Sequence, residues 1–191
     1  IIIKPALSEA ELLEFPGIGS LEAFNTDGLR SLLYTMQIPN MKEKTLRYPG
    51  HIDKIKLFRD TGFFDTETIP GTNSSPLEFT SKILFEQWKL EPDEQEFTLL
   101  RIIIKGSKDG QQIKTTWNMY DEFDEKTGLS SMARTTGFTA TAAARLLLVD
   151  GFRHIGICPP EFIGADKLSF ERMMKYLKQR KINYQRTDSI D

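Results

Sequence analysis

The stretch that decides the fold is Glu96–Asp121, which reads EFTLLRIIIKGSKDGQQIKTTWNMYD. Its two halves, Glu96–Lys105 and Gln111–Asp121, are rich in apolar and β-branched residues, and the turn-forming residues 106–110 separate them. In the second half, apolar or β-branched side chains alternate with polar ones, which is the period of a half-buried strand. The first set is Ile113, Thr115, Trp117 and Met119, and the second is Lys114, Thr116, Asn118 and Tyr120. We therefore predict a β-hairpin with one core face and one polar face.

Strands and helices are expected on both sides of this hairpin. The most specific signal is Ser75-Pro76-Leu77-Glu78, a capping box with proline at the first helical position, which starts a helix that runs to about Leu90. Further strands or extended segments are predicted over Glu11–Phe15, Leu21–Thr26, Lys42–Tyr48 and Ile182–Thr187, and further helices over Leu29–Met36, His51–Asp60, Ser131–Val149 and Asp166–Lys181. The elements are mixed without a repeated βαβ unit. This order favours the α+β class, with a mixed β-sheet and helices mainly on one face.

The predicted helix Ser131–Val149 carries a stripe of small residues at helical spacing. Such a stripe lets another backbone or a ligand come close, and a glycine inside a helix needs a packing or functional reason. Of the two explanations, tight packing on the sheet is favoured over a ligand. The stripe consists of Ala133, Gly137, Ala140 and Ala144.

Composition and charge exclude several classes of protein. The 191 residues form one domain or one lobe of a larger protein, and 25 Lys and Arg nearly balance 27 Asp and Glu, so no nucleic-acid partner is expected. The longest apolar run, Ala142–Val149, is interrupted by Arg145 and is too short to span a membrane. The single cysteine, Cys158, fits a reducing compartment, so we expect a cytoplasmic protein. Because the chain opens Ile1-Ile2-Ile3 rather than with methionine, we expect it to be part of a longer protein.

Motifs for nucleotides and metals are incomplete. Gly17-Ile18-Gly19 supplies two glycines of a dinucleotide fingerprint, but Glu22 stands in place of the third, and a strand follows instead of a helix. The nitrogen and sulfur ligands are limited to His51, His154 and Cys158, which do not make up a metal site, so no metal is expected. The acidic residues at the end of the hairpin match no calcium loop and are interpreted as a solvated strand end.

Two polar clusters remain as candidate binding sites. Thr45–His51 places Arg47 and His51 around a turn that starts a helix, where backbone N–H groups, a guanidinium and a titratable imidazole can receive a carboxylate. Arg134, which two threonines follow, offers a second cation near a helix start. Each cluster alone is explained slightly better by a surface arginine that pairs with a glutamate. Together they suggest a pocket for a small anionic or zwitterionic molecule.

Several segments give the chain a specific resemblance to a known family. Phe15–Arg30 reads FPGIGSLEAFNTDGLR, Lys44–His51 reads KTLRYPGH, and Ser131–Phe138 reads SMARTTGF, followed by an alanine-rich helix and by Cys158-Pro159-Pro160-Glu161. In this order, over nearly the whole chain, they resemble the C-terminal domain of the saccharopine dehydrogenase family. The forms TDGLR and YPGH are more similar to the lysine 6-dehydrogenase branch than to true saccharopine dehydrogenases.

This resemblance implies a two-part enzyme. Residues 1–191 would be its substrate-binding and dimerisation domain, built on a sheet similar to that of the C-terminal domain of glyceraldehyde-3-phosphate dehydrogenase. An N-terminal Rossmann domain would bind NAD or NADP, and the last segment, about residues 156–191, would return toward it. The reaction would move a hydride between the nicotinamide and the amine-bearing carbon of lysine or a lysine-derived amino acid, giving an imine that water hydrolyses. The expected partners are that small amino acid, the Rossmann domain and a second copy of the chain in a homodimer, without a membrane.

The resemblance also assigns roles to residues of the first cluster. Arg47 would hold a substrate carboxylate, and His51 would be the catalytic acid or base. Either Asn25 or Thr26 corresponds to the family's substrate-binding asparagine, because the comparison needs a one-residue gap at this position.

In the second cluster, Arg134 would contribute to substrate binding, and Thr135 would face the cofactor cleft. The polar face of the hairpin is predicted to be a sheet-to-sheet dimer contact. The alternative from a different class is a non-catalytic module for small-molecule binding or assembly that has the same fold.

Overall fold

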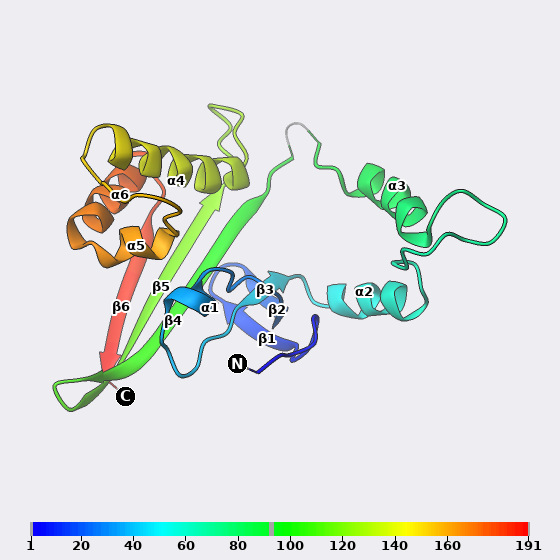
Figure 1. The fold of residues 1–191 in the computed structure, drawn as a ribbon, viewed down its shortest axis with the longest axis horizontal. Helices are drawn as coiled ribbons and strands as arrows, with labels where there is room; N and C mark the ends of the chain where they lie inside the picture. Colours follow the sequence, from blue (N-terminus) through cyan, green and yellow to red (C-terminus); the bar gives the residue numbers. More distant parts are fainter. Residues whose placement is uncertain (1, 92–93, 191) are drawn as a thin grey trace. The chain divides into compact units, whose positions relative to one another are not determined.

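The computed structural model describes residues 2–91 and 94–190 (Figure 1). The chain divides into two compact units, an N-terminal unit, Ile1–Lys89, and a C-terminal unit, Leu90–Asp191. Each unit contains a three-stranded sheet together with helices, which confirms the α+β class. The named strands form two separate sheets, and in both of them neighbouring strands are antiparallel.

The sheet of the N-terminal unit has the order β1-β2-β3. Strands β1 (Glu11–Phe15) and β2 (Gly19–Asn25) form a hairpin, and β3 (Lys44–Arg47) pairs with the other edge of β2. The hairpin turns at Gly17 and Gly19, whose φ angles of 81° and 99° are favourable only for glycine. All three segments lie where the sequence predicted extended chain.

Three helices complete the N-terminal unit, α1 (Leu32–Thr35), α2 (His51–Asp60) and α3 (Pro76–Trp88). The helix predicted over Leu29–Met36 was too long, because Arg30 has a φ of 46° and only one helical turn follows it. The prediction for α2 is confirmed at both ends. The capping box at the start of α3 is confirmed too, since Glu78 and Ser75 bond each other's backbone N–H groups.

The predicted hairpin of residues 96–121 is confirmed in the C-terminal unit as β4 (Phe97–Lys108) and β5 (Gln111–Glu122). Its strands are longer than expected because residues 106–108 pair with residues 111–113. The turn is only Asp109-Gly110, whose φ angles of 53° and 79° are those of a two-residue hairpin loop that follows the strand twist. Strand β6 (Tyr184–Ile190) pairs with β5, so the order is β4-β5-β6.

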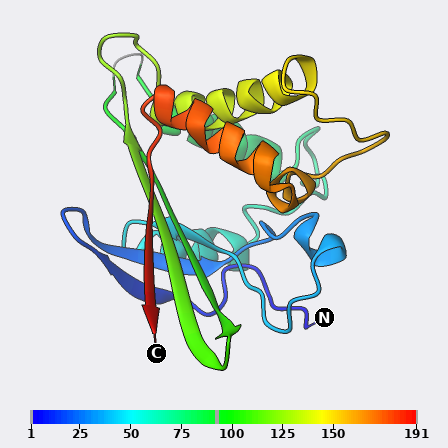
Figure 2. The same cartoon turned by 90° about the vertical axis from the view of Figure 1, so that its left-hand side faces the viewer.

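Helices α4 (Ser131–Leu148), α5 (Pro160–Ala165) and α6 (Lys167–Gln179) lie on one face of this sheet (Figures 1 and 2). The core between the helices and the sheet is built on Met119, Leu177 and Ile182, all of which are buried. The helices α4 and α6 were predicted, whereas the short α5 was not. The described residues contain no helix long and apolar enough to cross a membrane.

The stripe of small residues on α4 lies mostly at the surface, so the expectation that it packs on the sheet was wrong. Ala133, Ala140 and Ala144 are exposed, and a Cβ placed on Gly137 would have no neighbouring atom within 4 Å. The helix buries a different face, from which Ser131 and Arg134 form hydrogen bonds with residues of β4 and β5. The buried residues of α4 are Ser131, Arg134, Ala142 and Leu146.

Candidate functional site

The candidate site of the N-terminal unit lies on one face of strands β2 and β3. In the antiparallel register Glu22 is opposite Arg47, and Phe24 is opposite Thr45. Residues opposite each other point to the same side of a sheet, and so do residues two apart along one strand. The hydroxyl of Thr26 lies 3.0 Å from that of Thr45, which places Thr26 beside this face as well. The predicted residues Thr26 and Arg47 thus share a surface with Glu22.

A second carboxylate, Glu43, fixes the loop that follows β2. It accepts a hydrogen bond from the hydroxyl of Thr26 and another, at 3.1 Å, from the backbone N–H of Gly28. A Cβ on Gly28 would lie 2.5 Å from the Cδ of Glu43, so only glycine leaves this carboxylate in place. The close packing against Glu43 therefore explains why the TDGLR segment has a glycine at position 28.

Asn25, the other candidate for the substrate-binding position, lies on the opposite face of β2. It is buried, and its side-chain amide donates hydrogen bonds of 3.1 Å to Ser8 Oγ and to Glu9 Oε2. Its backbone N–H also donates to the carbonyl of Ser8 at 3.1 Å. Asn25 thus ties the segment before β1 to the sheet, and Thr26 is the member of the pair whose hydroxyl lies beside Thr45, on the face that carries Glu22 and Arg47.

His51 is the first residue of α2, directly after Gly50, whose φ of 86° turns the chain from β3 into the helix. Its imidazole is half-buried. Burial is the largest cause that lowers the pKa of His51 below its ordinary value, and the charges of Arg47 and Lys54 lower it further, against an opposing effect of Glu22. At neutral pH the imidazole is therefore in its neutral, proton-accepting form.

Arg47 lies near this imidazole with its guanidinium exposed to solvent. Its Nη1 donates a hydrogen bond of 2.7 Å to the carbonyl oxygen of Leu46. Within residues 2–91 and 94–190 it forms no ion pair, in contrast to Arg59 on α2, which pairs with Asp60 at 2.8 Å. The surface ion pair that was the competing explanation for Arg47 is therefore not found in the part of the chain that the structure describes.

Glu22 is the residue of this site that the sequence reasoning missed. Its half-buried carboxylate accepts a hydrogen bond of 3.3 Å from the backbone N–H of Ile52, in the first turn of α2. A carboxylate is stabilised there by the helix dipole and by N–H groups without partners in the helix. The helix start that was predicted to receive a ligand carboxylate thus holds one of the chain's own. The alternation of β2 and its pairing with β3 would have placed Glu22 beside Arg47.

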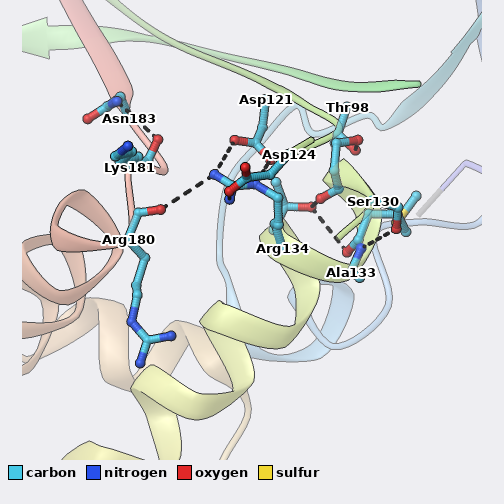
Figure 3. A network of polar contacts seen from close by, with 12 residues as sticks. Thr98, Asp121, Asp124, Ser130, Ala133, Arg134, Arg180, Lys181 and Asn183 are labelled. Carbon is cyan, nitrogen blue, oxygen red and sulfur yellow. Dashed lines mark hydrogen bonds and ion pairs between the residues drawn. The ribbon is translucent and has the colours of Figure 1, made fainter. Parts of the chain in front are cut away.

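In the C-terminal unit, Arg134 lies in a buried ion network that joins α4 to β5 (Figure 3). Its Nε and Nη2 donate to the two carboxylate oxygens of Asp121 at 2.8 and 3.1 Å, and Nη1 donates to Asp124 at 2.9 Å. The side chains of Arg134 and Asp121 are only 8% and 6% exposed. The hydrogen bonds to Asp121 raise the pKa of Arg134 above its ordinary value. The interpretation of Asp121 as part of a solvated strand end was therefore wrong.

The surroundings of Arg134 do not favour an anionic ligand. The open groove beside its guanidinium is lined by acidic side chains in greater number than basic ones. A carboxylate that entered this groove would meet like charges, which repel it. The acidic lining consists of Glu96, Asp121, Glu122, Asp124 and Glu125.

The start of α4 carries Thr135, the residue predicted to face the cofactor. Its hydroxyl donates to the carbonyl of Ser131 at 2.8 Å, a bond within its own helix. The first helical N–H group, that of Ser131, and the Ser131 hydroxyl donate to the carboxylate of Glu96. As in α2, a carboxylate of the chain itself occupies the helix start.

The segment Gly17-Ile18-Gly19 does not fit a dinucleotide. Gly17 and Gly19 form the tight turn between β1 and β2, so no helix start lies behind them to hold a pyrophosphate. Within residues 2–91 and 94–190, no three His, Cys, Asp or Glu side chains are grouped so that they could hold a metal ion. Among the described residues, the candidate site of the N-terminal unit offers an arginine, a carboxylate and a neutral imidazole.

Comparison with known protein families gives a match over nearly the whole chain. Residues 3–182 match the model of the saccharopine dehydrogenase C-terminal domain. This family belongs to the NAD(P)-dependent dehydrogenases in general, and its name implies a partner N-terminal domain and a small-molecule substrate. The chain therefore belongs to the saccharopine dehydrogenase C-terminal domain family and is an oxidoreductase-associated domain.

Proposed function

We propose that this chain is the substrate-binding and dimerisation domain of a cytoplasmic, NAD(P)-dependent oxidoreductase that acts on the CH–NH group of lysine or a lysine-derived amino acid. The observation that carries the proposal is that Arg47, which forms no ion pair within the described residues, lies near enough to His51 for its charge to help lower the pKa of the imidazole. Both residues lie in the family-matched segment. An amino acid needs a cation for its carboxylate and a base for its amine, and this surface offers both.

Arg47 would bind the carboxylate of the substrate. Four of its five N–H donors are left after the bond to Leu46, and a guanidinium matches a carboxylate in a two-pronged geometry. Because its side chain is exposed, the guanidinium can turn toward a ligand without breaking a buried contact. Thr26 lies on the same face, and because its hydroxyl donates to Glu43, its role would be to hold the loop that follows β2.

His51 would accept the proton that the substrate amine loses before oxidation. A base must be unprotonated at the working pH, and the lowered pKa of His51 provides this at neutral pH. NAD or NADP, whose binding we assign to the N-terminal domain, would accept the hydride. The residues of this chain contribute binding, orientation and proton transfer.

For the other predicted site residues we propose different roles. Asn25 would support the site by fixing the strand that carries Thr26. Arg134 and Thr135 stay predictions for substrate and cofactor binding, but their contacts within the C-terminal unit favour structural roles. The homodimer, with the polar face of β4 and β5 as its contact, also stays a prediction.

An assay of the full-length protein tests the proposal directly. We expect oxidation of at least one member of a panel of lysine, saccharopine and carboxylated polyamines, read as reduction of NAD or NADP by absorbance. The alternative, a non-catalytic binding or assembly module, predicts ligand binding by calorimetry without turnover of any panel member. Turnover only of amines that carry no carboxylate would contradict the role given to Arg47.

A further inference from the structure

We propose that Glu22 determines specificity by binding the α-ammonium group of the amino acid whose carboxylate Arg47 binds. This inference rests on the proposed function, because it takes Arg47 as the carboxylate-binding residue. An amino acid carries its ammonium and carboxylate on one carbon, so a site that recognises this head group needs an acid and a base side by side. Glu22 and Arg47 supply that pair.

The sheet register places the two side chains together. Glu22 and Arg47 are directly opposite each other on the antiparallel strands β2 and β3. The Cβ atoms of such a pair are about 4.5–5.5 Å apart, and both side chains extend from the same face of the sheet. Backbone pairing, rather than a flexible loop, thus fixes the two neighbouring points from which the side chains extend.

The two charges do not neutralise each other. Opposite charges that face each other across two strands normally pair, but here each is bound to the backbone. Glu22 accepts one hydrogen bond, from Ile52 N–H at 3.3 Å, and Arg47 donates one, to the carbonyl of Leu46 at 2.7 Å. Among the described residues neither side chain forms an ion pair. A carboxylate has about four acceptor positions, so most of the capacity of Glu22 is left for a cationic ligand.

Helix α2 also holds the side chain of Glu22 in position. A hydrogen bond from the backbone N–H of Ile52, in the first turn of α2, orients the carboxylate. Its half-buried setting reduces screening by water, which makes a charge-assisted hydrogen bond stronger than one on an open surface. A neutral or anionic group on the α-carbon would lack this bond and would be selected against.

The test compares three ligands on the full-length protein with NAD or NADP present. Lysine has both head groups, 6-aminohexanoate lacks only the α-amine, and 1,5-diaminopentane lacks only the carboxylate. For Glu22→Gln we expect the affinity for lysine to fall about tenfold by calorimetry, and the affinity for 6-aminohexanoate to change by less than about twofold. Glu86→Gln, which removes an exposed carboxylate of α3, is the matched control and should change neither.

The outcomes separate the inference from the proposed function. An equal loss for lysine and 6-aminohexanoate in Glu22→Gln would show that Glu22 only supports α2, and would overturn the inference while leaving the function in place. Unchanged binding of both carboxylate ligands in Arg47→Ala would overturn the proposed function itself. Should Glu22→Gln fail to fold, Glu22→Asp keeps the charge, and it should retain the preference for lysine over 6-aminohexanoate. Loss of that preference in a folded Glu22→Asp would count against the inference.

Discussion

Replacing Arg134 with methionine should destabilise the C-terminal unit by about 3 kcal/mol. The change keeps much of the side-chain length but removes a guanidinium that binds Asp121 through two oxygens and also binds Asp124. Asp121 would then be a buried charge without its cation, with a side chain only 6% exposed. Breaking a buried pair from one side costs roughly 3–5 kcal/mol, and the lower end applies because Asp124 is 28% exposed.

Urea denaturation of the whole chain, followed by tryptophan fluorescence, measures this loss. Of the two tryptophans, Trp117 packs edge-to-face against Phe170 in the C-terminal unit, whereas Trp88 belongs to α3 in the other unit. In a Trp88→Phe background the signal therefore reports the C-terminal unit alone. For a unit of this size, a loss of about 3 kcal/mol lowers the melting temperature by roughly 12–24 °C.

The matched variant is Arg134→Lys, which keeps the charge but cannot bind two oxygens in parallel. We expect it to cost about 1–2 kcal/mol, less than methionine. A loss below about 1 kcal/mol for Arg134→Met, together with a raised KM of the full-length enzyme, would refute the structural role. It would then support the original prediction that Arg134 binds substrate.

Three further predictions concern single residues. The kcat/KM of the full-length enzyme should rise with pH through the pKa of His51, because the neutral imidazole is the active form. That pKa lies below its ordinary value of 6.5. A kcat/KM that falls across this range would contradict the role of His51 as base. Gly28→Ala should displace Glu43 from Thr26 and cost about 1 kcal/mol in urea denaturation, and a stability equal to wild type would show that Glu43 moves freely. Gly137→Ala is its counterpart in an open position of a helix and should stabilise the chain by about 0.5–1 kcal/mol, so a loss would mean that another surface contacts the stripe on α4.

Elements whose signals are local could be predicted from the sequence. The alternation that ends at Met119 defines β5, and the capping box of Ser75 and Glu78 defines the start of α3, because the interacting groups are neighbours along the chain. The family match over residues 3–182 likewise follows from motifs that are continuous in sequence. His51 was correctly placed at the start of a helix for the same reason.

Features that depend on distant partners could not be predicted in this way. Asp121 resembled a solvated strand end because its partner Arg134 is separated from it by a loop and lies on a helix. Glu22 had no visible role until pairing with β3 placed it opposite Arg47, and α2 placed Ile52 N–H against it. Whether a polar residue in a strand faces solvent or a partner depends on register, which is a property of two segments rather than one.

The most direct test of the account is the KM of the full-length enzyme for its preferred amino acid after Arg47→Ala. Loss of a charge-assisted contact to a carboxylate should raise KM by about 10- to 100-fold, with little change in melting temperature, because the side chain is exposed. Arg59→Ala is the control, since this arginine pairs with the adjacent Asp60, and its KM should change less than about twofold. An unchanged KM in Arg47→Ala would contradict the central claim that the face of β2 and β3 binds the substrate carboxylate.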